Sequence, residues 1–158
     1  MSKAKAALGA EPTEEPVEEV LPVKGNGTFA FPDGSTYYGD FMEDTVKCIK
    51  TRDGEGTYSF GVESYSGSWR NDQMHGKGVY KFASGATYEG FFANGLFSGD
   101  GIYSFADGAV YRGSWKMNNM HGNGEYTDPN QTKWTGEFYN GMFDTGRSYI
   151  SLRPAAPL

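Results

Sequence analysis

A short motif recurs along this chain at a constant spacing, and this repetition restricts the fold more than any other feature. An aromatic residue, a glycine and a second aromatic residue alternate, first as Tyr65-x-Gly67-x-Trp69, and the motif starts again every 23 residues. The later copies are Tyr88-x-Gly90-x-Phe92, Tyr111-x-Gly113-x-Trp115 and Trp134-x-Gly136-x-Phe138. A fixed period of this length indicates a repeat protein, whose units bury apolar surface only by stacking on one another.

A second element follows the motif at a fixed offset and has the same alternation. It reads Gly76-x-Gly78-x-Tyr80 in its first regular copy and recurs as Gly99-x-Gly101-x-Tyr103 and Gly122-x-Gly124-x-Tyr126. A period of two is that of a β-strand, in which alternate side chains share a face. The connections "RNDQMH" and "FANGLF" are rich in Asn, Asp and Gly, which favour tight turns. Each repeat is therefore predicted to be two short strands, stacked with its neighbours along one long sheet.

The repeats divide the chain into three segments. Residues 1–24 contain no aromatic residue and are rich in Glu and Pro, so we expect a disordered acidic tail. Residues 25–146 form the repeat array, with a half copy at 25–36 and copies starting at positions 37, 65, 88, 111 and 134. The copy at Tyr37 is lengthened by extra residues around Cys48. Residues 147–158 are predicted to be a loop-like C-terminal tail.

Glycine and aromatic side chains fall on the same predicted face. Tyr65, Gly67 and Trp69 point one way, while Ser66 and Ser68 point to a polar face. A glycine beside a bulky ring leaves room for that ring to lie across the neighbouring strand. The glycines expected to serve this structural purpose are Gly67, Gly76, Gly78, Gly90, Gly99, Gly101, Gly113, Gly122, Gly124 and Gly136.

These motifs resemble the MORN (membrane occupation and recognition nexus) repeat, with the best fit in "YSGSW…MHGKGVY" and "YRGSW…MHGNGEY". The resemblance implies an all-β fold, an elongated, single-layered antiparallel sheet of consecutive β-hairpins without a catalytic site. It also implies a stand-alone scaffolding or docking protein, similar to those of cytoskeletal and ciliary assemblies such as the radial spoke.

The net charge and the targeting signals limit which classes of partner and which cellular compartments fit the chain. The chain has 14 basic and 20 acidic residues, a net charge of -6, which argues against nucleic acid and makes anionic membrane an unfavourable partner. A single cysteine, Cys48, fits a reducing compartment. The N-terminus has no signal-peptide pattern, and no run of about 20 apolar residues occurs. A cytoplasmic location is therefore expected, and the resemblance adds the cytoskeleton, specifically the axoneme of a cilium or flagellum.

The residues that could form a metal, nucleotide or catalytic site are better explained by structural roles. His75 and His121 occupy equivalent positions four predicted strands apart, too far to share a metal ion, and we expect each to order a turn edge. The Gly-x-Gly pairs run into predicted strands, whereas a nucleotide cradle needs a following helix. The Asp128 segment lacks the glycine of a calcium loop, and nothing marks a nucleophile or its base. We expect no enzyme activity, no catalytic residue, no cofactor and no metal.

The aromatic row is the predicted recognition surface. A single-layered sheet has no second layer to cover it, so an exposed row of rings could receive a peptide or a partner helix. The expected protein-binding residues are Tyr65, Trp69, Tyr88, Phe92, Tyr111, Trp115, Trp134 and Phe138. The end strands also leave unpaired backbone groups, which allows a homodimer through the C-terminal repeat.

The sequence thus favours a non-enzymatic structural adaptor that binds other proteins in a cytoskeletal assembly. Two alternatives stay open. One is a peripheral membrane or phosphoinositide-binding module, and the other is a regulatory docking partner of a separate enzyme.

Overall fold

The computed structural model describes residues 21–153. Most of the predicted acidic tail therefore lies outside the described residues, as do residues 154–158. The described part of the chain consists of strands and loops, and it contains no helix long and apolar enough to cross a membrane.

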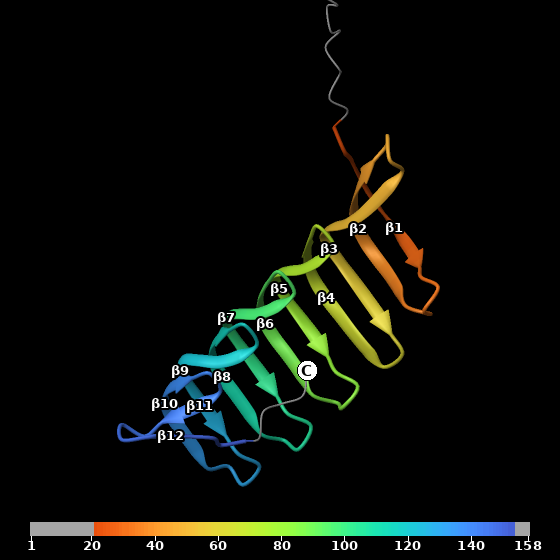
Figure 1. Cartoon of the computed structure of the whole chain (residues 1–158). Helices are drawn as coiled ribbons and strands as arrows, with labels where there is room; N and C mark the ends of the chain where they lie inside the picture. The colour runs from red at the N-terminus through yellow and green to blue at the C-terminus, as the bar shows by residue number, and fades with distance from the viewer. Residues whose placement is uncertain (1–20, 154–158) are drawn as a thin grey trace, which may run out of the picture.

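The chain folds into one open sheet in which the strands are hydrogen-bonded in chain order (Figure 1). Every strand pairs antiparallel with the next, because short turns return the chain beside the strand it has just left. The predicted all-β sheet of consecutive hairpins is confirmed. The strands are β1 (Val23–Ala30), β2 (Thr36–Asp44), β3 (Ile49–Phe60), β4 (Glu63–Arg70), β5 (Gln73–Lys81), β6 (Thr87–Ala93), β7 (Leu96–Ser104), β8 (Val110–Lys116), β9 (Asn119–Thr127), β10 (Lys133–Tyr139), β11 (Met142–Asp144) and β12 (Tyr149–Ile150).

Two-residue turns join the strands within the regular repeats, as the Asn- and Asp-rich segments predicted. Both turn residues have positive φ, for example 46° at Asn71 and 64° at Asp72 between β4 and β5. This is the geometry of a type I′ turn, whose twist matches that of the flanking strands. The extra residues of the second repeat enlarge the loop between β2 and β3, where Cys48 is exposed.

Strand register brings equivalent residues of all repeats into straight rows across the sheet. Gly67 lies opposite Gly56 on one side and Gly78 on the other, and Tyr65 lies opposite Tyr58 and Tyr80. The resulting glycine row runs through Gly27, Gly39, Gly56, Gly67, Gly78, Gly90, Gly101, Gly113, Gly124 and Gly136. The core lies on the aromatic face beside this row.

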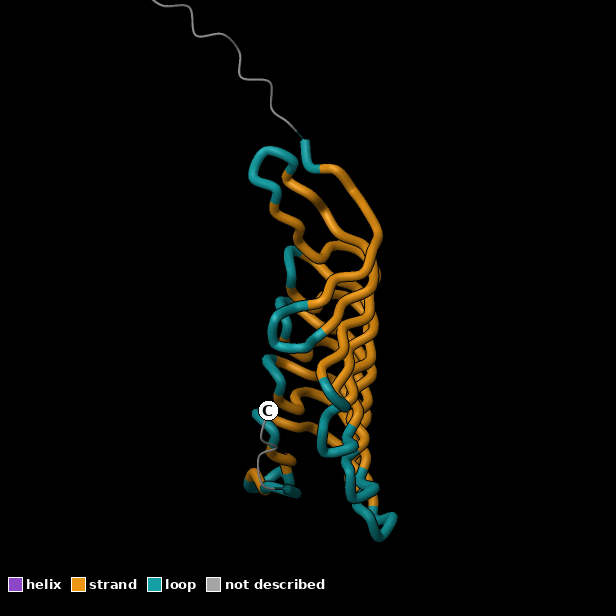
Figure 2. Tube along the Cα trace, turned by 90° about the vertical axis from the view of Figure 1, so that its right-hand side faces the viewer, coloured by secondary structure: helices purple, strands orange, loops and turns teal. Residues whose placement is uncertain are grey.

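The sheet bends at each repeat because the two strands of a hairpin differ in length beyond the glycine row. Gly67 faces Gly78 and Trp69 faces Met74, so a single residue of β4 lies opposite three of β5. Such a bulge bends the strand and increases its twist. Gly76 occupies the bulge with a φ of 67°, and Gly99 and Gly122 repeat it at 65° and 64°. Viewed from the side in Figure 2, strand ends and loops stand away from the stacked strand bodies, which makes the sheet a trough.

Candidate protein-interaction groove

Four tyrosines form the floor of the trough and are fully buried. The side chains of Tyr37, Tyr65, Tyr88 and Tyr111 have 0% relative exposure. Each hydroxyl donates a hydrogen bond to the backbone carbonyl three residues later, at 2.8 Å from Tyr65 to Ser68. The equivalent distances for the other three tyrosines are 2.6, 2.9 and 3.0 Å. The strand that carries the tyrosine, opposite the bulged strand, thus curls around its own ring, which the neighbouring glycines leave room to hold.

Trp69 and Trp115, each two residues beyond the glycine row, contact the preceding repeat. Trp69 Nε1 donates to the Gly56 carbonyl at 3.1 Å, and Trp115 Nε1 donates to the Gly101 carbonyl at 3.2 Å. Trp69 meets the Tyr65 ring edge to face, with 5.1 Å between ring centroids. Edge-to-face pairs of this kind add to the stability gained by burial. The two tryptophans therefore connect repeats within the fold.

The structure corrects the expectation that the aromatic row lies open. Of the eight predicted protein-binding residues, Trp134 alone is half-buried, and the rest are buried in the core. Those seven are Tyr65, Trp69, Tyr88, Phe92, Tyr111, Trp115 and Phe138. A single layer can bury them because the bend turns each hairpin over its own rings. Their role in binding stays a prediction, and replacing them would test stability first.

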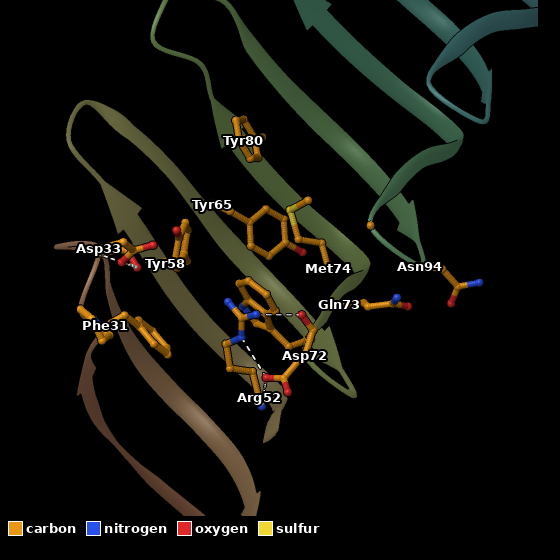
Figure 3. Close-up of a pocket in the computed structure, with 14 residues that line it drawn as sticks. Phe31, Asp33, Arg52, Tyr58, Tyr65, Asp72, Gln73, Met74, Tyr80 and Asn94 are labelled. Carbon is orange, nitrogen blue, oxygen red and sulfur yellow. Dashed lines mark hydrogen bonds and ion pairs between the residues drawn. The ribbon is translucent and has the colours of Figure 1, made fainter. Parts of the chain in front are cut away.

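What remains open is a groove along the N-terminal part of the trough. Its volume is about 720 Å³, and it is lined by the loop between β1 and β2, by strands β3, β4 and β5, and by the turns after β4 and β6. Figure 3 shows Phe31 and Asp33 at one side, Tyr58 and Tyr80 on the floor, and the hairpin tip with Gln73 opposite. Apolar rings with a few polar groups are typical of a ligand-binding surface.

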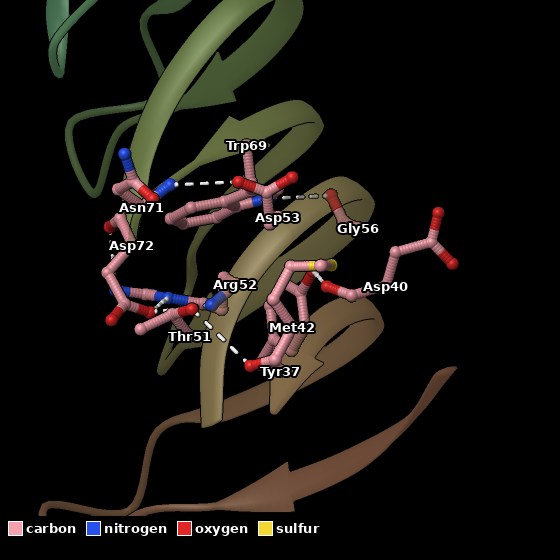
Figure 4. A network of polar contacts seen from close by, with 10 residues as sticks. All are labelled: Tyr37, Asp40, Met42, Thr51, Arg52, Asp53, Gly56, Trp69, Asn71 and Asp72. Carbon is pink, nitrogen blue, oxygen red and sulfur yellow. Dashed lines mark hydrogen bonds and ion pairs between the residues drawn. The ribbon is translucent and has the colours of Figure 1, made fainter. Parts of the chain in front are cut away.

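Arg52 is part of the lining of this groove and was not predicted as a functional residue. Its guanidinium lies over the Trp69 ring, 4.2 Å from the centroid, and its Nε donates to Asp72 Oδ1 at 3.1 Å (Figure 4). Arg52 faces Phe41 across the sheet, the position that Met74 holds opposite Trp69. The strand register therefore shows that Arg52 stands where another repeat has a packed methionine. The sequence alone hides this equivalence, because the copy that starts at Tyr37 contains extra residues.

The C-terminal segment after β12 occupies the opposite end of the trough. Arg153 lies over the Phe105 ring at 3.9 Å and donates to both carboxylate oxygens of Asp107, at 3.0 and 2.6 Å. Leu152 packs against the aromatic core. The cavity there is smaller, about 310 Å³, and Ser151 and Arg153 are part of its lining. The described part of the predicted loop-like tail thus includes a short strand and a segment docked on the sheet.

The buried tyrosine hydroxyls in the trough stabilise the fold. Burial raises the pKa of Tyr37 to about 12 and raises the pKa values of Tyr65, Tyr88 and Tyr111 further, which keeps these hydroxyls protonated. His75 and His121 lie within β5 and β9, so the expectation that they order turn edges is wrong.

Their Nδ1 atoms are buried and have no hydrogen-bond partner among the described residues. Residues 21–153 contain no cluster of three potential metal ligands.

Comparison with known proteins agrees with this geometry. No curated protein matches the chain. The family model of the MORN repeat matches residues 24–36, 65–87, 88–110 and 111–133, together just over half of the chain. These segments coincide with the predicted half copy and with the copies starting at positions 65, 88 and 111. The chain therefore belongs to the MORN repeat family.

Proposed function

We propose that this protein is a non-enzymatic structural adaptor, which binds a short segment of another protein in the open N-terminal part of its groove. MORN repeats generally take part in protein or membrane interactions and are a non-catalytic type of repeat. One observation favours a protein segment: the other end of the same trough already holds Leu152 and Arg153 of this chain. The groove at Phe31 and Tyr58 offers similar aromatic surface with more space.

The cellular setting of the proposal is a cytoskeletal assembly, specifically the axoneme of a cilium or flagellum. This setting is part of the proposal and extends the general role of MORN repeats in protein or membrane interactions. An elongated sheet would space its partners along one axis (Figure 1). A tagged copy expressed in ciliated cells should concentrate along the cilium, and a uniform cytoplasmic signal would contradict the axonemal part of the proposal.

A site-specific photo-crosslinker tests the groove itself in cells. Gln73 is exposed and lines the groove, whereas Lys77 is exposed on the opposite face of the same strand. We expect a crosslinker at position 73 to form a covalent adduct with another protein, and the matched crosslinker at position 77 to form none. Adducts from position 77 alone would place the interface on the polar face and overturn the groove proposal.

The homodimer through the C-terminal repeat stays a prediction with a narrow structural basis. The terminal strand β12 has two residues, so it offers few free backbone groups. Both of its residues, Tyr149 and Ile150, are exposed, as are Tyr139 and Met142 of the neighbouring strands. Mass measurement of the full chain at several concentrations tests whether these side chains join two copies.

A further inference from the structure

Two loops of the sheet, one between β1 and β2 and the other between β7 and β8, have the same sequence pattern and the same backbone geometry. They are Phe31-Pro32-Asp33-Gly34-Ser35 and Phe105-Ala106-Asp107-Gly108-Ala109. In both, the phenylalanine amide donates to the carbonyl four residues later at 2.9 Å, and the glycine amide donates back to the phenylalanine carbonyl at 3.0 Å. Gly34 and Gly108 have φ values of 86° and 89°. The ring and the carboxylate of each loop are therefore held on equivalent frames.

The aspartate in each loop has one oxygen committed to the turn. Asp33 Oδ1 accepts from the Ser35 amide at 2.9 Å, as Asp107 Oδ1 accepts from the Ala109 amide at 3.1 Å. The second oxygen of Asp107 accepts the shorter hydrogen bond from Arg153. Within residues 21–153, the hydrogen bonds of Asp33 are those from Ser35, and both end on Oδ1.

Phe31 lacks the cover that Arg153 gives to Phe105. Its side chain has 39% relative exposure, and it lines the groove together with Asp33. The charged residues that share this lining are Arg52 and Asp72, which pair with each other. The remaining charge is that of Asp33, so the groove presents an aromatic face beside an uncompensated carboxylate. A guanidinium complements both, because it stacks on rings and bonds carboxylates through two N–H groups.

The two other five-residue loops with the same backbone hydrogen bonds, at 82–86 and 128–132, do not combine the two groups. The loop after β5 has Phe82 followed by Ser84 where the carboxylate would be. In the loop after β9, the Asp128 amide donates to the Thr132 carbonyl at 2.9 Å, as the phenylalanine amide does in the other loops. Asp128 therefore occupies the position of the phenylalanine, and this loop has no ring there. Among these four five-residue loops, a ring with a carboxylate is thus confined to those at 31–35 and 105–109.

We propose that Phe31 and Asp33 form a binding site for an arginine side chain on a segment of a partner protein. The guanidinium would stack on Phe31 and donate to Asp33, as Arg153 does with Phe105 and Asp107, while a neighbouring apolar residue enters the aromatic groove as Leu152 does. This inference rests on the proposed function and specifies the chemistry of the partner segment.

A peptide titration of the full chain tests the site. The probe is the C-terminally amidated peptide Ser-Tyr-Ile-Ser-Leu-Arg, which copies residues 148–153, followed by backbone amide NMR. We expect shifts concentrated at residues 31–35, with a dissociation constant below about 1 mM. Asp33→Asn keeps an oxygen for the Ser35 hydrogen bonds but removes the charge, and it should weaken binding about tenfold or more. A peptide with Lys in place of Arg should bind similarly weakly.

Asp128→Asn is the matched control, because it removes the carboxylate of an equivalent loop that has no phenylalanine. It should leave the affinity unchanged, and the amide spectrum of each variant should remain that of the folded sheet. Unchanged affinity after Asp33→Asn, or shifts at residues 105–109 alone, would overturn the arginine site. A dimer of the full chain that Asp33→Asn dissociates would also overturn it, since the occupant would be a second copy.

The two proposals fail in different ways. If the peptide shifts Gln73 and its neighbours but ignores Asp33→Asn, the groove function stands and the arginine site is wrong. If the peptide binds at Asp33 but crosslinks form only from position 77 in cells, the arginine site stands and the proposed cellular function is wrong.

Discussion

The ring of Tyr65 lies directly across Gly78 on the neighbouring strand. A Cβ atom added to Gly78 would be 2.5 Å from both Cε2 and the hydroxyl oxygen of Tyr65. The same contact recurs between Tyr88 and Gly101 and between Tyr111 and Gly124. Glycine is therefore required at these positions because any larger residue would overlap the tyrosine ring, and each ring packs against the neighbouring strand.

Gly78→Ala should destabilise the protein by about 1–3 kcal/mol, because the methyl group has no room beside a fully buried ring. Gly27→Ala is the matched control, since Gly27 lies in the same row and its added Cβ would be 3.6 Å from Phe41. Urea unfolding of both variants measures the difference. Equal loss of stability in the two would show that strand glycines matter through backbone freedom and not through the tyrosine contact.

Tyr65→Phe should reduce the free energy of unfolding by about 1 kcal/mol, the usual contribution of one intramolecular hydrogen bond. The hydroxyl donates to the Ser68 carbonyl at 2.8 Å, and without it that carbonyl loses its partner at the bulge. Tyr38→Phe provides the comparison, because Tyr38 is 62% exposed. If the two variants unfold at the same urea concentration, the hydroxyl does not stabilise the curled strand.

Alternation and turn composition were sufficient to predict the strands, their hairpin order and the shared face of Tyr65 and Gly67. These features depend on local spacing, which the sequence states directly. The bend was not predicted, because it arises where three residues of β5 oppose one of β4, and two strands must be paired before that mismatch is visible. This bend is also what buries Trp69, so the predicted exposure of the row was wrong for the same reason.

The groove residues Arg52, Phe31 and Asp33 carried weaker signals than the repeated aromatics. Arg52 stands in a packed methionine position that the lengthened loop shifts out of the 23-residue period. The contact of Arg153 with Asp107 spans 46 residues and occurs once. A periodic pattern finds what all repeats share, whereas this groove is built from residues that differ between repeats. A search for repeated loops would have paired "FPDGS" with "FADGA".

The buried tyrosines predict a loss of stability in alkaline solution. In the folded protein burial raises the pKa of Tyr37 to about 12 and those of Tyr65, Tyr88 and Tyr111 further. The unfolded chain ionises near the ordinary value of 10, so above it the unfolded state binds fewer protons and stability falls as pH rises. The urea midpoint should be insensitive to these groups below pH 10 and decline above it.

Ultraviolet absorbance provides the independent check on that decline, because it follows tyrosinate directly. The four buried tyrosines should ionise only together with the loss of the sheet. Full ionisation of all tyrosines with the sheet intact would contradict the assignment.

Vesicles containing anionic lipid should bind the protein weakly. The polar face mixes Lys77 and Arg112 with Glu55, Glu89 and Asp100, so it has no concentrated positive charge to hold a negative surface. Co-sedimentation with anionic and neutral vesicles at two salt concentrations measures this. Micromolar binding that salt abolishes would favour the peripheral membrane alternative.

Arg153→Ala should release the C-terminal segment from the loop at Asp107 and raise the pKa of that carboxyl toward its ordinary value. The hydrogen bonds from Arg153 are the largest cause of the lowered pKa of Asp107, followed by that from the Ala109 amide. A lowered pKa stabilises the docked segment above the ordinary carboxyl value, and this stabilisation disappears as pH falls through the folded-state pKa. Asp33 serves as the internal reference, because its lowered pKa comes from Ser35 and should not change. NMR titration of the two carboxyl groups in wild type and variant measures both. An unaltered Asp107 titration would show that the segment is not docked through Arg153 in solution, and the arginine site proposed at Phe31 and Asp33 would lose its template.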